Sequence, residues 1–331
     1  MRPDILVLGQ GLGGTLLAWE LERAGIGFRL VDPGHDAAAT TAAAGIINPI
    51  TGRRLVKSWR VEALLPAARA VYGDLAAQLG VPLWRDLRVR RRFADERERA
   101  TWAEKNARGE LAPFAGAGDA EGFWIEPAAR VDLGALLGAA RRRWRAMGRL
   151  RTERFDAVDL AAALAEHAAV IDCTGRAATR TAEFRFVPWE FSHGEMLELA
   201  VAGLAPDVVL NRRHWIVPVG AGVAWVGATH TPGVREVAPT PAARFALEAS
   251  ARDLLGDAHP FVVTGQRAGV RVNLPDKRPV AGRHPSSPRL GLCNGLGAKG
   301  ALWAPLLARQ WVNHLTTGAG FDPEIDVTRF V

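Results

Sequence analysis

Three glycines near the N-terminus have the spacing of a turn that holds a dinucleotide. Gly9, Gly11 and Gly14 follow the apolar run DILVL (4–8), and Asp32 ends the next apolar run, FRLVD. In such a turn the first glycine permits a tight bend, the second lets the backbone approach a pyrophosphate, and the third lets the next helix pack against the strand. Asp32 could accept hydrogen bonds from ribose hydroxyls, and its charge disfavours the 2′-phosphate of NADP. The spacing predicts a bound dinucleotide without separating NAD from FAD.

A second glycine-rich stretch, GLGAKG (295–300), follows an apolar run close to the C-terminus. Its N–H groups and the charge of Lys299 could face the pyrimidine edge of a flavin, where negative charge develops on reduction. The alternative is an ordinary strand–helix turn with a surface lysine. A flavin dinucleotide is long and must be held at both ends, and this stretch could hold the end that the first loop cannot reach. The pair of loops therefore favours FAD over NAD.

The residues around both loops predict the elements that would position them. The first loop lies in a strand–turn–helix–strand unit of about thirty residues, which is the context that its glycines require. The other expected elements are a strand at 168–175, short strands between 183 and 233, and helices at 62–80, 131–148, 240–255 and 304–315. We expect Pro305 in the first turn of the last helix, where proline is tolerated. Residues 83–127 give no clear pattern.

The composition is that of a globular enzyme. The chain has 331 residues, of which 48% are apolar and 23% are charged, and this is enough for two lobes. No apolar run is long enough to span a membrane, and the N-terminus lacks the layout of a signal peptide, so we expect a cytoplasmic protein without membrane partners. Cys173 and Cys293 are the two cysteines, and without a C-x-x-C pair they argue against a disulfide framework or a metal site.

The 42 basic residues exceed the 35 acidic ones, which gives a formal net charge of +7. Arginines gather in RVRRRF (88–93) and RRRWR (141–145), which could mark a nucleic-acid surface. Because no nucleic-acid motif accompanies them, we favour solvated helix faces and do not expect a nucleic-acid partner. Four further basic residues after the second predicted strand could make a pocket entrance positive, although a solvated helix face is the favoured interpretation. They are Arg53, Arg54, Lys57 and Arg60.

Four separated segments resemble the D-amino acid oxidase and glycine oxidase family of FAD-dependent oxidoreductases. They are GQGLGGTLLAWELERAGIGFRLVD (9–32), ATTAAAGIINP (39–49), VIDCTGRAA (170–178), and AGVRVNLPDKRPVAGRHP with LGLCNGLGAKGALWAP (268–305). Two more segments, SHGEML (192–197) and HWIVPVGAGVAWVGAT (214–229), resemble the family's central strands. The segments occur in the order that the family has, and together they touch roughly half of the chain.

The resemblance implies an α/β fold in which a Rossmann-like, GR2-type FAD-binding domain carries an inserted β-rich substrate domain of α+β type. The FAD-binding domain would comprise residues 1–80, 131–182 and 265–331, and the substrate domain residues 81–130 and 183–264. Some relatives attach the flavin through cysteine or histidine. The GVRVNLPDKRP stretch holds no cysteine, so we expect noncovalent FAD.

The resemblance also implies which residues contact the cofactor. The N-terminal loop and Asp32 would hold the ADP half, the small-residue loop after the second strand would pass along the diphosphate and flavin, and the C-terminal loop would face the flavin. The expected contacts are Gly9, Gly11, Leu12, Gly13, Gly14, Asp32, Thr40, Thr41, Ala44, Gly45, Ile46, Thr174, Gly175, Gly295, Gly297, Ala298, Lys299, Gly300 and Ala301. We expect Lys299 to act on the reaction as well.

For the substrate, the resemblance implies an arginine that pairs with a carboxylate, and the matching residue is Arg271. A guanidinium suits this role because it can bond a carboxylate in a bidentate manner, although a salt bridge between the lobes is the alternative. His214 and Trp215 stand where relatives place a substrate-side aromatic residue. Two departures weaken the match: Val272 stands where the family often has proline, and the single tyrosine, Tyr72, lies elsewhere.

The implied reaction oxidises a C–N bond of a small amine or amino acid of the glycine, D-amino acid or sarcosine type. A hydride would pass to flavin N5, and water would hydrolyse the imine. This chemistry depends on orientation more than on a protein acid or base. The electron acceptor, oxygen or another molecule, stays open. Two alternatives also stay open: a flavoprotein that acts on a larger target such as a modified tRNA base, and a non-catalytic dinucleotide-binding redox protein.

Overall fold

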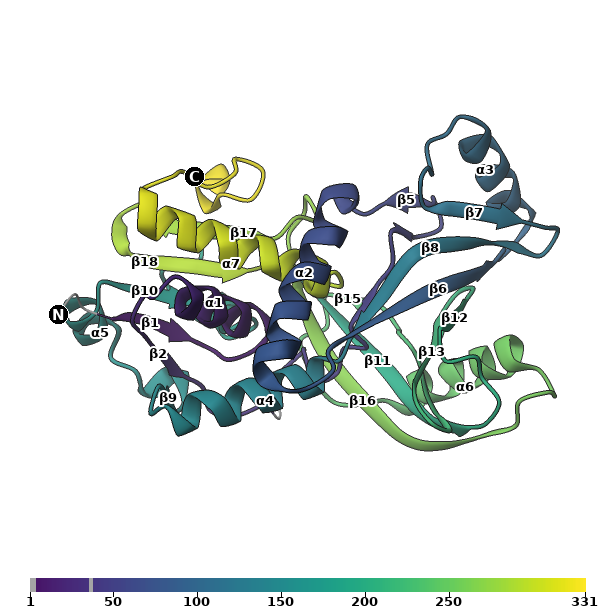
Figure 1. The fold of residues 1–331 in the computed structure, drawn as a ribbon, viewed down its shortest axis with the longest axis horizontal. Coiled ribbons are helices and arrows are strands. Elements are labelled where there is room, and N and C mark those ends of the chain that lie inside the picture. Colours follow the sequence, from purple (N-terminus) through teal and green to yellow (C-terminus); the bar gives the residue numbers. More distant parts are fainter. Residues whose placement is uncertain (1–3, 36–37) are drawn as a thin grey trace.

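The computed structural model describes residues 4–35 and 38–331, and these form two lobes that lie side by side along the long axis (Figure 1). One lobe is built on a six-stranded sheet and the other on a ten-stranded sheet. The chain starts in the six-stranded lobe, passes into the other lobe, and ends in the first, so segments from distant parts of the sequence share one sheet.

The six-stranded sheet has the order β17-β18-β10-β1-β2-β9. Its strands are β1 (Ile5–Leu8), β2 (Phe28–Val31), β9 (Leu150–Arg151), β10 (Ala169–Asp172), β17 (Val280–His284) and β18 (Ser287–Asn294). All neighbours are parallel except β17, which is antiparallel to β18. Every residue of β1 and β10 is buried, as expected of parallel strands that are covered on both faces.

Five α-helices are described in this lobe: α1 (Leu12–Arg23), α2 (Val61–Leu79), α4 (Leu133–Ala146), α5 (Leu160–Glu166) and α7 (Gly300–Thr317). Short 3₁₀ turns are η1 (Phe155–Ala157), η2 (Ala178–Arg180) and η3 (Val327–Phe330). The helices α1 and α7 pack against each other beside the sheet (Figure 1). Both helices begin at the glycine-rich loops, so their packing places the two loops at one edge of the sheet.

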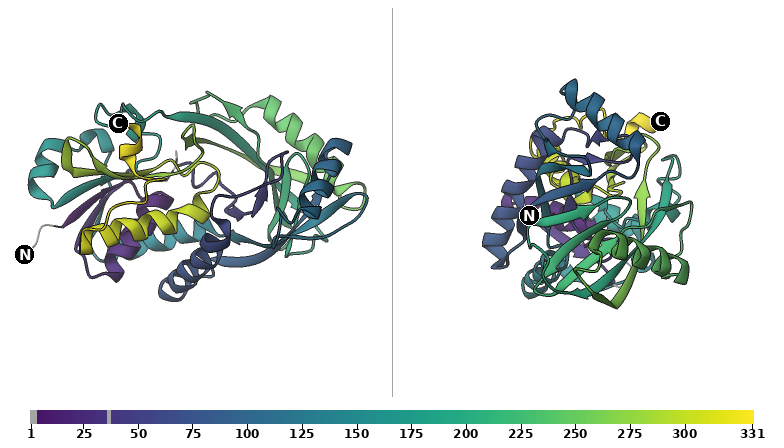
Figure 2. Two further views of the ribbon diagram at one scale, coloured as in Figure 1. Left: turned by 90° about the horizontal axis from the view of Figure 1, so that it is seen from above. Right: turned by 90° about the vertical axis from the view of Figure 1, so that its right-hand side faces the viewer.

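The ten-stranded sheet has the order β15-β11-β14-β13-β12-β6-β8-β3, while β16 pairs with β11 and β7 pairs with β8. Its strands are β3 (Ile46–Ile47), β6 (Trp84–Arg92), β7 (Ala115–Gly118), β8 (Gly122–Val131), β11 (Glu190–Val201), β12 (Val208–Asn211), β13 (Trp215–Gly220), β14 (Val223–Gly227), β15 (Thr231–Pro232) and β16 (Phe261–Asn273). The sheet curls, and α6 (Pro241–Leu255) lies along one of its faces (Figure 2).

The segment that gave no clear pattern contains β6, α3 (Glu96–Ala107), β7 and β8. Asp95 begins α3 by accepting a hydrogen bond from the backbone N–H of Glu98 at 2.9 Å. Nearby, β4 (Ile50–Thr51) and β5 (Val56–Lys57) form a separate two-stranded sheet. The arginines of β6 obscure the alternation of apolar and polar residues that marks a strand. They are accommodated there because carboxylates elsewhere in the fold pair with them.

The expected position of Pro305 in the first turn of the last helix is wrong. That helix, α7, begins at Gly300, so Pro305 lies inside it. Proline has no N–H and leaves the carbonyl four residues earlier, that of Ala301, without its helical partner. The hydroxyl of Tyr72 donates to this carbonyl at 3.0 Å. A side chain from α2 therefore replaces the hydrogen bond that Pro305 cannot make.

The expected boundary at residue 265 falls inside a strand. Residues 261–273 form β16, which pairs with β11 from Glu190 to Val201. The first part of the 265–331 segment therefore lies in the ten-stranded sheet, and only the part after β16 returns to the six-stranded sheet. Within the described part of the chain, no helix is both long and apolar enough to cross a bilayer.

Candidate active site

A cavity of about 1040 Å³ lies where the two sheets meet, and both glycine-rich loops line it. Most of the predicted cofactor contacts border it. They are Gly9, Gly11, Leu12, Gly13, Asp32, Thr40, Ala44, Gly45, Ile46, Thr174, Gly175, Gly297, Ala298, Lys299, Gly300 and Ala301. Gly14, Thr41 and Gly295 do not border it. The cavity thus gathers segments from the start, middle and end of the chain.

The N-terminal loop requires glycine at two positions for steric reasons. Gly9 has φ +94°, and a Cβ on it would lie 2.7 Å from the carbonyl oxygen of Cys173. A Cβ on Gly14 would lie 1.8 Å from the carbonyl oxygen of Gly9, so Gly14 packs under the turn and does not line the cavity. Gly11 caps α1 without a side-chain hydrogen bond, which leaves the positive end of the helix open to an anion.

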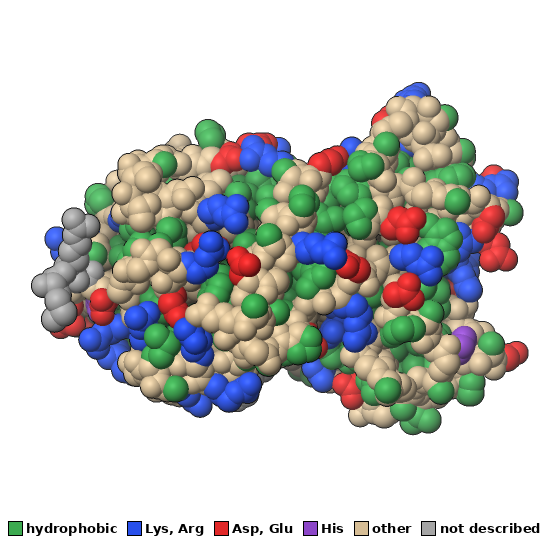
Figure 3. All heavy atoms as spheres, in the orientation of Figure 1, with side chains coloured by type: hydrophobic (Ala, Val, Ile, Leu, Met, Phe, Trp, Pro, Cys, Tyr) green, Lys and Arg blue, Asp and Glu red, His purple; other side chains and the backbone are tan. Residues whose placement is uncertain are grey.

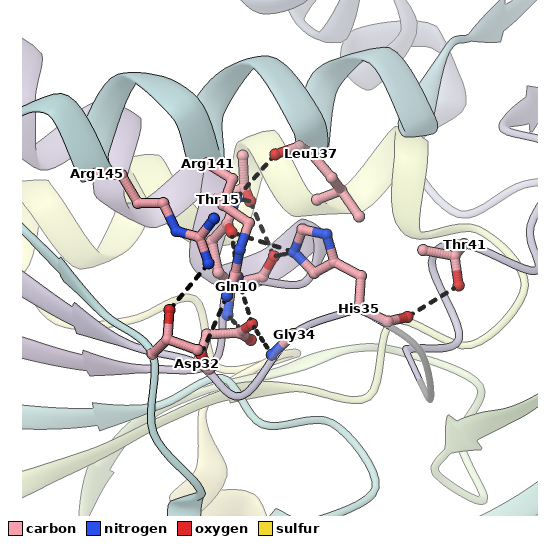
Figure 4. Close-up of polar contacts among 10 residues, drawn as sticks. Gln10, Thr15, Asp32, Gly34, His35, Thr41, Leu137, Arg141 and Arg145 are labelled. Carbon is pink, nitrogen blue, oxygen red and sulfur yellow. Dashed lines mark hydrogen bonds and ion pairs between the residues drawn. The ribbon is translucent and has the colours of Figure 1, made fainter.

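Asp32 at the end of β2 is held by a network around the first loop (Figure 4). One carboxylate oxygen accepts from the N–H of Gln10 at 2.7 Å, and the other accepts from the N–H of Gly34 at 2.8 Å and from Arg141 at 2.6 Å. Arg141 also donates to the side chain of Gln10 at 3.0 Å. A carboxylate has about four acceptor positions, so one is left for a ligand hydroxyl.

Sequence reasoning missed Gln10 and Arg141. The available signal was the position of Arg141 on α4, four residues after the buried Leu137 and three before the buried Trp144, which places it on the buried face of the helix. Its side chain is 11% exposed. The first arginine of RRRWR is therefore a partner of Asp32 and not part of a solvated face.

The small-residue loop is pressed between the two sheets. Gly45 has φ +73°, and a Cβ there would lie 2.0 Å from the carbonyl oxygen of Val131. Arg130 on β8 donates to the carbonyl of Ala44 at 3.1 Å. Thr41 turns away from the cavity, because its hydroxyl donates to the carbonyl of Ala38 at 2.8 Å. Small residues suit this loop because it leaves no room for side chains on the sheet side.

The C-terminal loop presents Lys299 at the start of α7. Its ammonium group lies 6.0 Å from the ring centroid of Trp303, and burial lowers its pKa to about 8. Gly297 has φ +51° and donates its N–H to the carbonyl of Val272 at 3.0 Å. This bond fixes the loop to the end of β16, close to Arg271.

Asp172 is a further residue that sequence reasoning missed. It is buried at the end of β10 and accepts hydrogen bonds from the N–H of Thr174 at 2.8 Å and from its hydroxyl at 2.7 Å. Burial raises the pKa of Asp172 to about 6. The carboxyl group shapes the turn that brings Thr174 and Gly175 to the cavity.

Arg271 on β16 lines the cavity and lies over Gly194 on β11. A Cβ on Gly194 would lie 2.3–2.5 Å from three atoms of the guanidinium group, so the glycine makes room for it. Arg271 donates to the carbonyl of Thr229 at 3.3 Å, and burial lowers its pKa. Among the described residues, no carboxylate forms an ion pair with it, so the alternative of an interlobe salt bridge has no support.

Trp215 lines the cavity, whereas His214 does not. The Nδ1 atom of His214 lies 2.7 Å from the hydroxyl of Ser250 on α6, and burial lowers the pKa of this histidine. Successive side chains along an extended chain point to opposite faces, so only one of these neighbours can face the cavity. Trp215 therefore borders the same cavity as Arg271, and His214 lies against α6.

Most arginines of the basic runs are engaged within the fold. Arg88 pairs with Asp207 at 3.2 Å, and Arg90 pairs with Asp119 at 2.7 Å. Acidic and basic side chains lie interspersed over much of the face in Figure 3. The remaining pairs relevant here are Arg91 with Glu98, Arg143 with Glu22, Arg53 with Asp95, Lys57 with Glu62, and Arg60 with Asp322 and Glu324. Of the four basic residues expected near an entrance, Arg53 lines the cavity.

Cys173 and Cys293 are both buried free thiols, and both border the cavity. Burial also raises the pKa of Cys173 well above its usual value. Among residues 4–35 and 38–331, no cluster of three or more His, Cys, Asp or Glu side chains could hold a metal ion. The residues present fit an extended dinucleotide: open glycine turns at two helix starts, a carboxylate at Asp32 with an acceptor position free, and a half-buried lysine at Lys299.

Comparisons with known proteins agree with this geometry. The family model described as FAD dependent oxidoreductase, DAO, matches residues 4–313. The chain is 32% identical to the tRNA 5-methylaminomethyl-2-thiouridine biosynthesis bifunctional protein MnmC of Maricaulis maris, over 95% of this chain and 52% of that protein. It is 25% identical to the glycine oxidase of Bacillus licheniformis, over 92% and 90%.

Two solved structures have the same fold. Iminodiacetate oxidase from Chelativorans sp. BNC1 matches with a TM-score of 0.78 at 21% identity, over 97% of this chain and 98% of that one. Glycine oxidase from Geobacillus kaustophilus matches with a TM-score of 0.77 at 19% identity, over 100% and 99%. The chain spans about half the length of the MnmC relative, so the activity of that whole protein does not transfer to it directly.

Proposed function

This chain belongs to the DAO family of FAD-dependent oxidoreductases, and from that premise we propose that it oxidises a C–N bond of a small amine that carries a carboxylate. Members of the family bind FAD noncovalently and act on amines and amino acids. Here the start of α1 and Asp32 would hold the ADP half of FAD. The small-residue loop would run along its middle, and Lys299 would lie at the flavin.

The observation that carries the proposal is the half-buried Arg271, which has no carboxylate partner among the described residues. A guanidinium that has lost most of its water gains from a bidentate carboxylate, because charge-assisted hydrogen bonds are stronger in a shielded site. Gly194 leaves the space that the guanidinium needs, and the carbonyl of Thr229 orients it. Trp215 borders the same cavity and would pack against the rest of the substrate.

The residues of the chain would act by placing the substrate. Arg271 would hold the carboxylate of the substrate, so that the neutral amine and the α-carbon would face the flavin. The small-residue loop would exclude water. Bound FAD supplies the acceptor for the hydride that leaves the α-carbon, and water then cleaves the imine. Because the protein positions the substrate and FAD accepts the hydride, the reaction requires no protein nucleophile and no paired carboxylates.

The test is anaerobic reduction of the purified flavoprotein by a panel of amines. The panel contains glycine, sarcosine, D-amino acids and iminodiacids. At least one of them should bleach the flavin absorbance. Arg271→Ala should raise the required concentration of that substrate while FAD stays bound, and Arg271→Lys should recover part of the loss. Unchanged kinetics in Arg271→Ala would remove this residue from the site.

A second candidate, oxidation of a modified tRNA base, is favoured by the 32% identity to the MnmC relative. The formal charge of +7 would help such binding, but the pairing of the basic runs with carboxylates leaves less of that charge free. Affinity for tRNA that falls steeply with salt would support this candidate. Salt-independent or absent binding, together with turnover of a small amine, would exclude it. The non-catalytic alternative has no separate support in this family.

A further inference from the structure

Residues 39–45 of the small-residue loop cannot fix their own conformation by side-chain packing. They are four alanines, two threonines and one glycine, and such short side chains bury little apolar surface. All of them except Thr41 border the cavity. Because each unfixed backbone residue has many accessible conformations, contacts from outside the loop must select the one observed.

This loop connects two strands that lie far apart in the ten-stranded sheet. It passes close over Gly269 on β16, where a Cβ would lie only 3.0 Å from the Cβ of Ala42. It then reaches β8, where the N–H of Val131 donates to the carbonyl of Gly45 at 2.9 Å. In the sheet order, β16 pairs with β11, whereas β8 lies near the opposite end. The loop is therefore held between strands that only the curl of the sheet brings together.

An arginine from each of these strands donates to a loop carbonyl. The Nε–H of Arg130 on β8 donates to Ala44 at 3.1 Å, and a guanidinium N–H of Arg267 on β16 donates to Thr41 at 3.5 Å. Both guanidinium carbons lie 5.1 Å from the ring centroid of Trp225 on β14, within the range of a cation–π contact. Arg130, Trp225 and Arg267, here called the Trp225 cluster, thus join three strands to one loop.

Two carboxylates keep the Trp225 cluster in place. Glu198 on β11 accepts from Nε1 of Trp225 at 3.3 Å and from Arg267 at 3.0 Å. Asp132 accepts from Arg130 at 3.4 Å, and Arg130 is only 5% exposed. None of the three cluster residues borders the cavity. The cluster would therefore act on a bound cofactor through the loop.

We propose that the Trp225 cluster positions the small-residue loop for FAD, so that Arg130, Trp225 and Arg267 strengthen cofactor binding without touching the cofactor. A loop that lacked these contacts would have to become ordered as FAD binds, and that ordering lowers affinity. From the other lobe, the N–H of Leu12 at the start of α1 donates to the hydroxyl of Thr40 at 3.3 Å. Both lobes thus fix the loop. This inference goes beyond the proposed function, since it concerns FAD binding whatever substrate is oxidised.

The first test is FAD affinity, measured by fluorescence titration of the FAD-free protein. Trp225→Leu removes the ring that both arginines contact and should raise the Kd for FAD roughly tenfold. Trp225→Phe keeps an aromatic ring but loses the Nε1–H, so it should recover most of the affinity. A wild-type Kd in Trp225→Leu would overturn the proposal. If Trp225→Phe binds FAD as weakly as Trp225→Leu, the ring contacts are not the cause.

Trp124→Leu is the matched control. Trp124 on β8 also lies against two arginines, with Arg88 at 4.8 Å and Arg90 at 5.5 Å from its ring centroid. These arginines pair with carboxylates outside the loop. Trp124→Leu should therefore bind FAD like the wild type. A tenfold loss in this variant as well would show that Trp225→Leu acts through a general loosening of the sheet.

Amide hydrogen exchange separates a local effect on the loop from a loss of overall stability. In the FAD-free protein, Trp225→Leu should speed exchange in residues 39–45 and leave exchange in β1 and α1 unchanged. Bound FAD should restore part of the protection of the loop. Faster exchange throughout the chain, or unchanged exchange in the loop, would contradict a positioning role.

Arg267→Gln then assigns part of the effect to one arginine. This variant should weaken FAD binding about threefold, because the Arg267 side chain is 45% exposed and exposed charged contacts contribute modestly. In the Trp225→Leu background the same change should have a smaller effect, since both residues act through one loop. Fully additive effects would contradict a shared role.

These measurements need no turnover, so they separate this inference from the proposed function. If Trp225→Leu weakens FAD binding but no amine reduces the flavin, the Trp225 cluster keeps its role and the proposed reaction fails. If an amine reduces the flavin but FAD affinity is equal in Trp225→Leu and Trp124→Leu, the proposed function stands and the cluster has no positioning role.

Discussion

Arg271 depends on the absence of a side chain at Gly194. Because a Cβ at Gly194 would overlap the guanidinium, Gly194→Ala should displace Arg271 from the cavity. Loss of a charged hydrogen bond of about 1.5–3 kcal/mol corresponds to a rise in KM of roughly tenfold or more. Steady-state kinetics with a carboxylated amine check this, and the flavin spectrum should stay unchanged.

Gly220→Ala is the matched control, because a Cβ at Gly220 meets no atom within 4 Å. If Gly194→Ala and Gly220→Ala have equal KM values, Arg271 tolerates a side chain beneath it. The space at Gly194 would then not be required for binding the substrate carboxylate.

Lys299 gives the site a charge that disappears in the alkaline range. Burial lowers its pKa to about 8, so the ammonium form dominates below pH 8 and the neutral form above it. A cation beside the flavin favours the reduced, negatively charged form. The midpoint potential of bound FAD should therefore fall more steeply with pH above 8 than below it.

Lys299→Met should lower the midpoint potential at pH 7 and remove the change of slope near pH 8, as measured by spectroelectrochemical titration. Lys277→Met is the control, since Lys277 is exposed and pairs with Glu190. A slope change that persists in Lys299→Met would assign it to another group.

Asp172 couples stability to pH. Its pKa is raised from 3.8 in the unfolded chain to about 6 in the folded protein. A carboxyl group with a raised pKa contributes fully to the stability of the folded state below pH 3.8, and this contribution is lost as the pH rises through 6. Asp172→Asn keeps an acceptor for Thr174 and cannot ionise. Between pH 4 and 7 the wild type should therefore lose up to about 3 kcal/mol of unfolding free energy relative to the variant.

Urea unfolding at several pH values measures this difference. Asp257→Asn, a change at an exposed position, should follow the wild type throughout. If Asp172→Asn also follows the wild type, the carboxyl group is not the source of the pH dependence.

At the scale of elements, α7 contains a proline whose cost is reduced by α2. The hydroxyl of Tyr72 donates to the Ala301 carbonyl that Pro305 leaves free. Tyr72→Phe should destabilise the fold by about 1–3 kcal/mol, because the buried carbonyl then lacks a donor. Pro305→Ala restores a helical N–H, so Tyr72→Phe should cost less in that background.

Chemical denaturation of the four proteins in this double-mutant cycle gives the coupling energy. Equal costs of Tyr72→Phe in both backgrounds would mean that the two residues act independently, and that the bond to Ala301 does not compensate for the proline.

The pairing of charges across elements explains how an arginine-rich chain keeps an ordered second lobe. Arg88 and Arg90 on β6 pair with Asp207, just before β12, and with Asp119, between β7 and β8, whereas the next residue, Arg91, pairs with Glu98 on α3. The arginines of RVRRRF thus hold the strand against its neighbours through partners that are distant in sequence. Because those partners are not visible locally, the run by itself did not predict a strand.

At the scale of the whole molecule, the cavity exists because both lobes line it. The N-terminal loop, the small-residue loop and the C-terminal loop approach it from the six-stranded lobe, and β16, β13 and β6 approach it from the other. FAD should therefore stabilise both lobes together. At a free concentration of one hundred times its Kd, FAD adds about 2.7 kcal/mol to the unfolding free energy.

Thermal unfolding of the FAD-free protein with added FAD tests this. One transition should move upward as FAD increases, whereas AMP, which resembles only the adenosine end, should shift it less. If FAD moved one of two separate transitions and left the other unchanged, the lobes would unfold independently and the cavity would couple them weakly.

The sequence by itself determined the features that rest on local sterics and periodicity. The glycines at positions 9, 11 and 14 are recognisable because a bend and a close helix packing require glycine whatever the rest of the chain does. The helices at 62–80 and 240–255 match α2 and α6 within two residues, because apolar spacing records which face is buried. Arg271 was found through a family resemblance that the family match now supports.

The tertiary structure alone decided which residues share the site. Arg141 reaches Asp32 from 109 residues away, Tyr72 reaches Ala301 from 229 residues away, and β16 joins β11 instead of the six-stranded sheet. His214 and Trp215 are neighbours in the chain, yet only Trp215 faces the cavity. Such partnerships follow from how sheets and helices pack, and no local pattern encodes them because the energy of each contact depends on both ends at once.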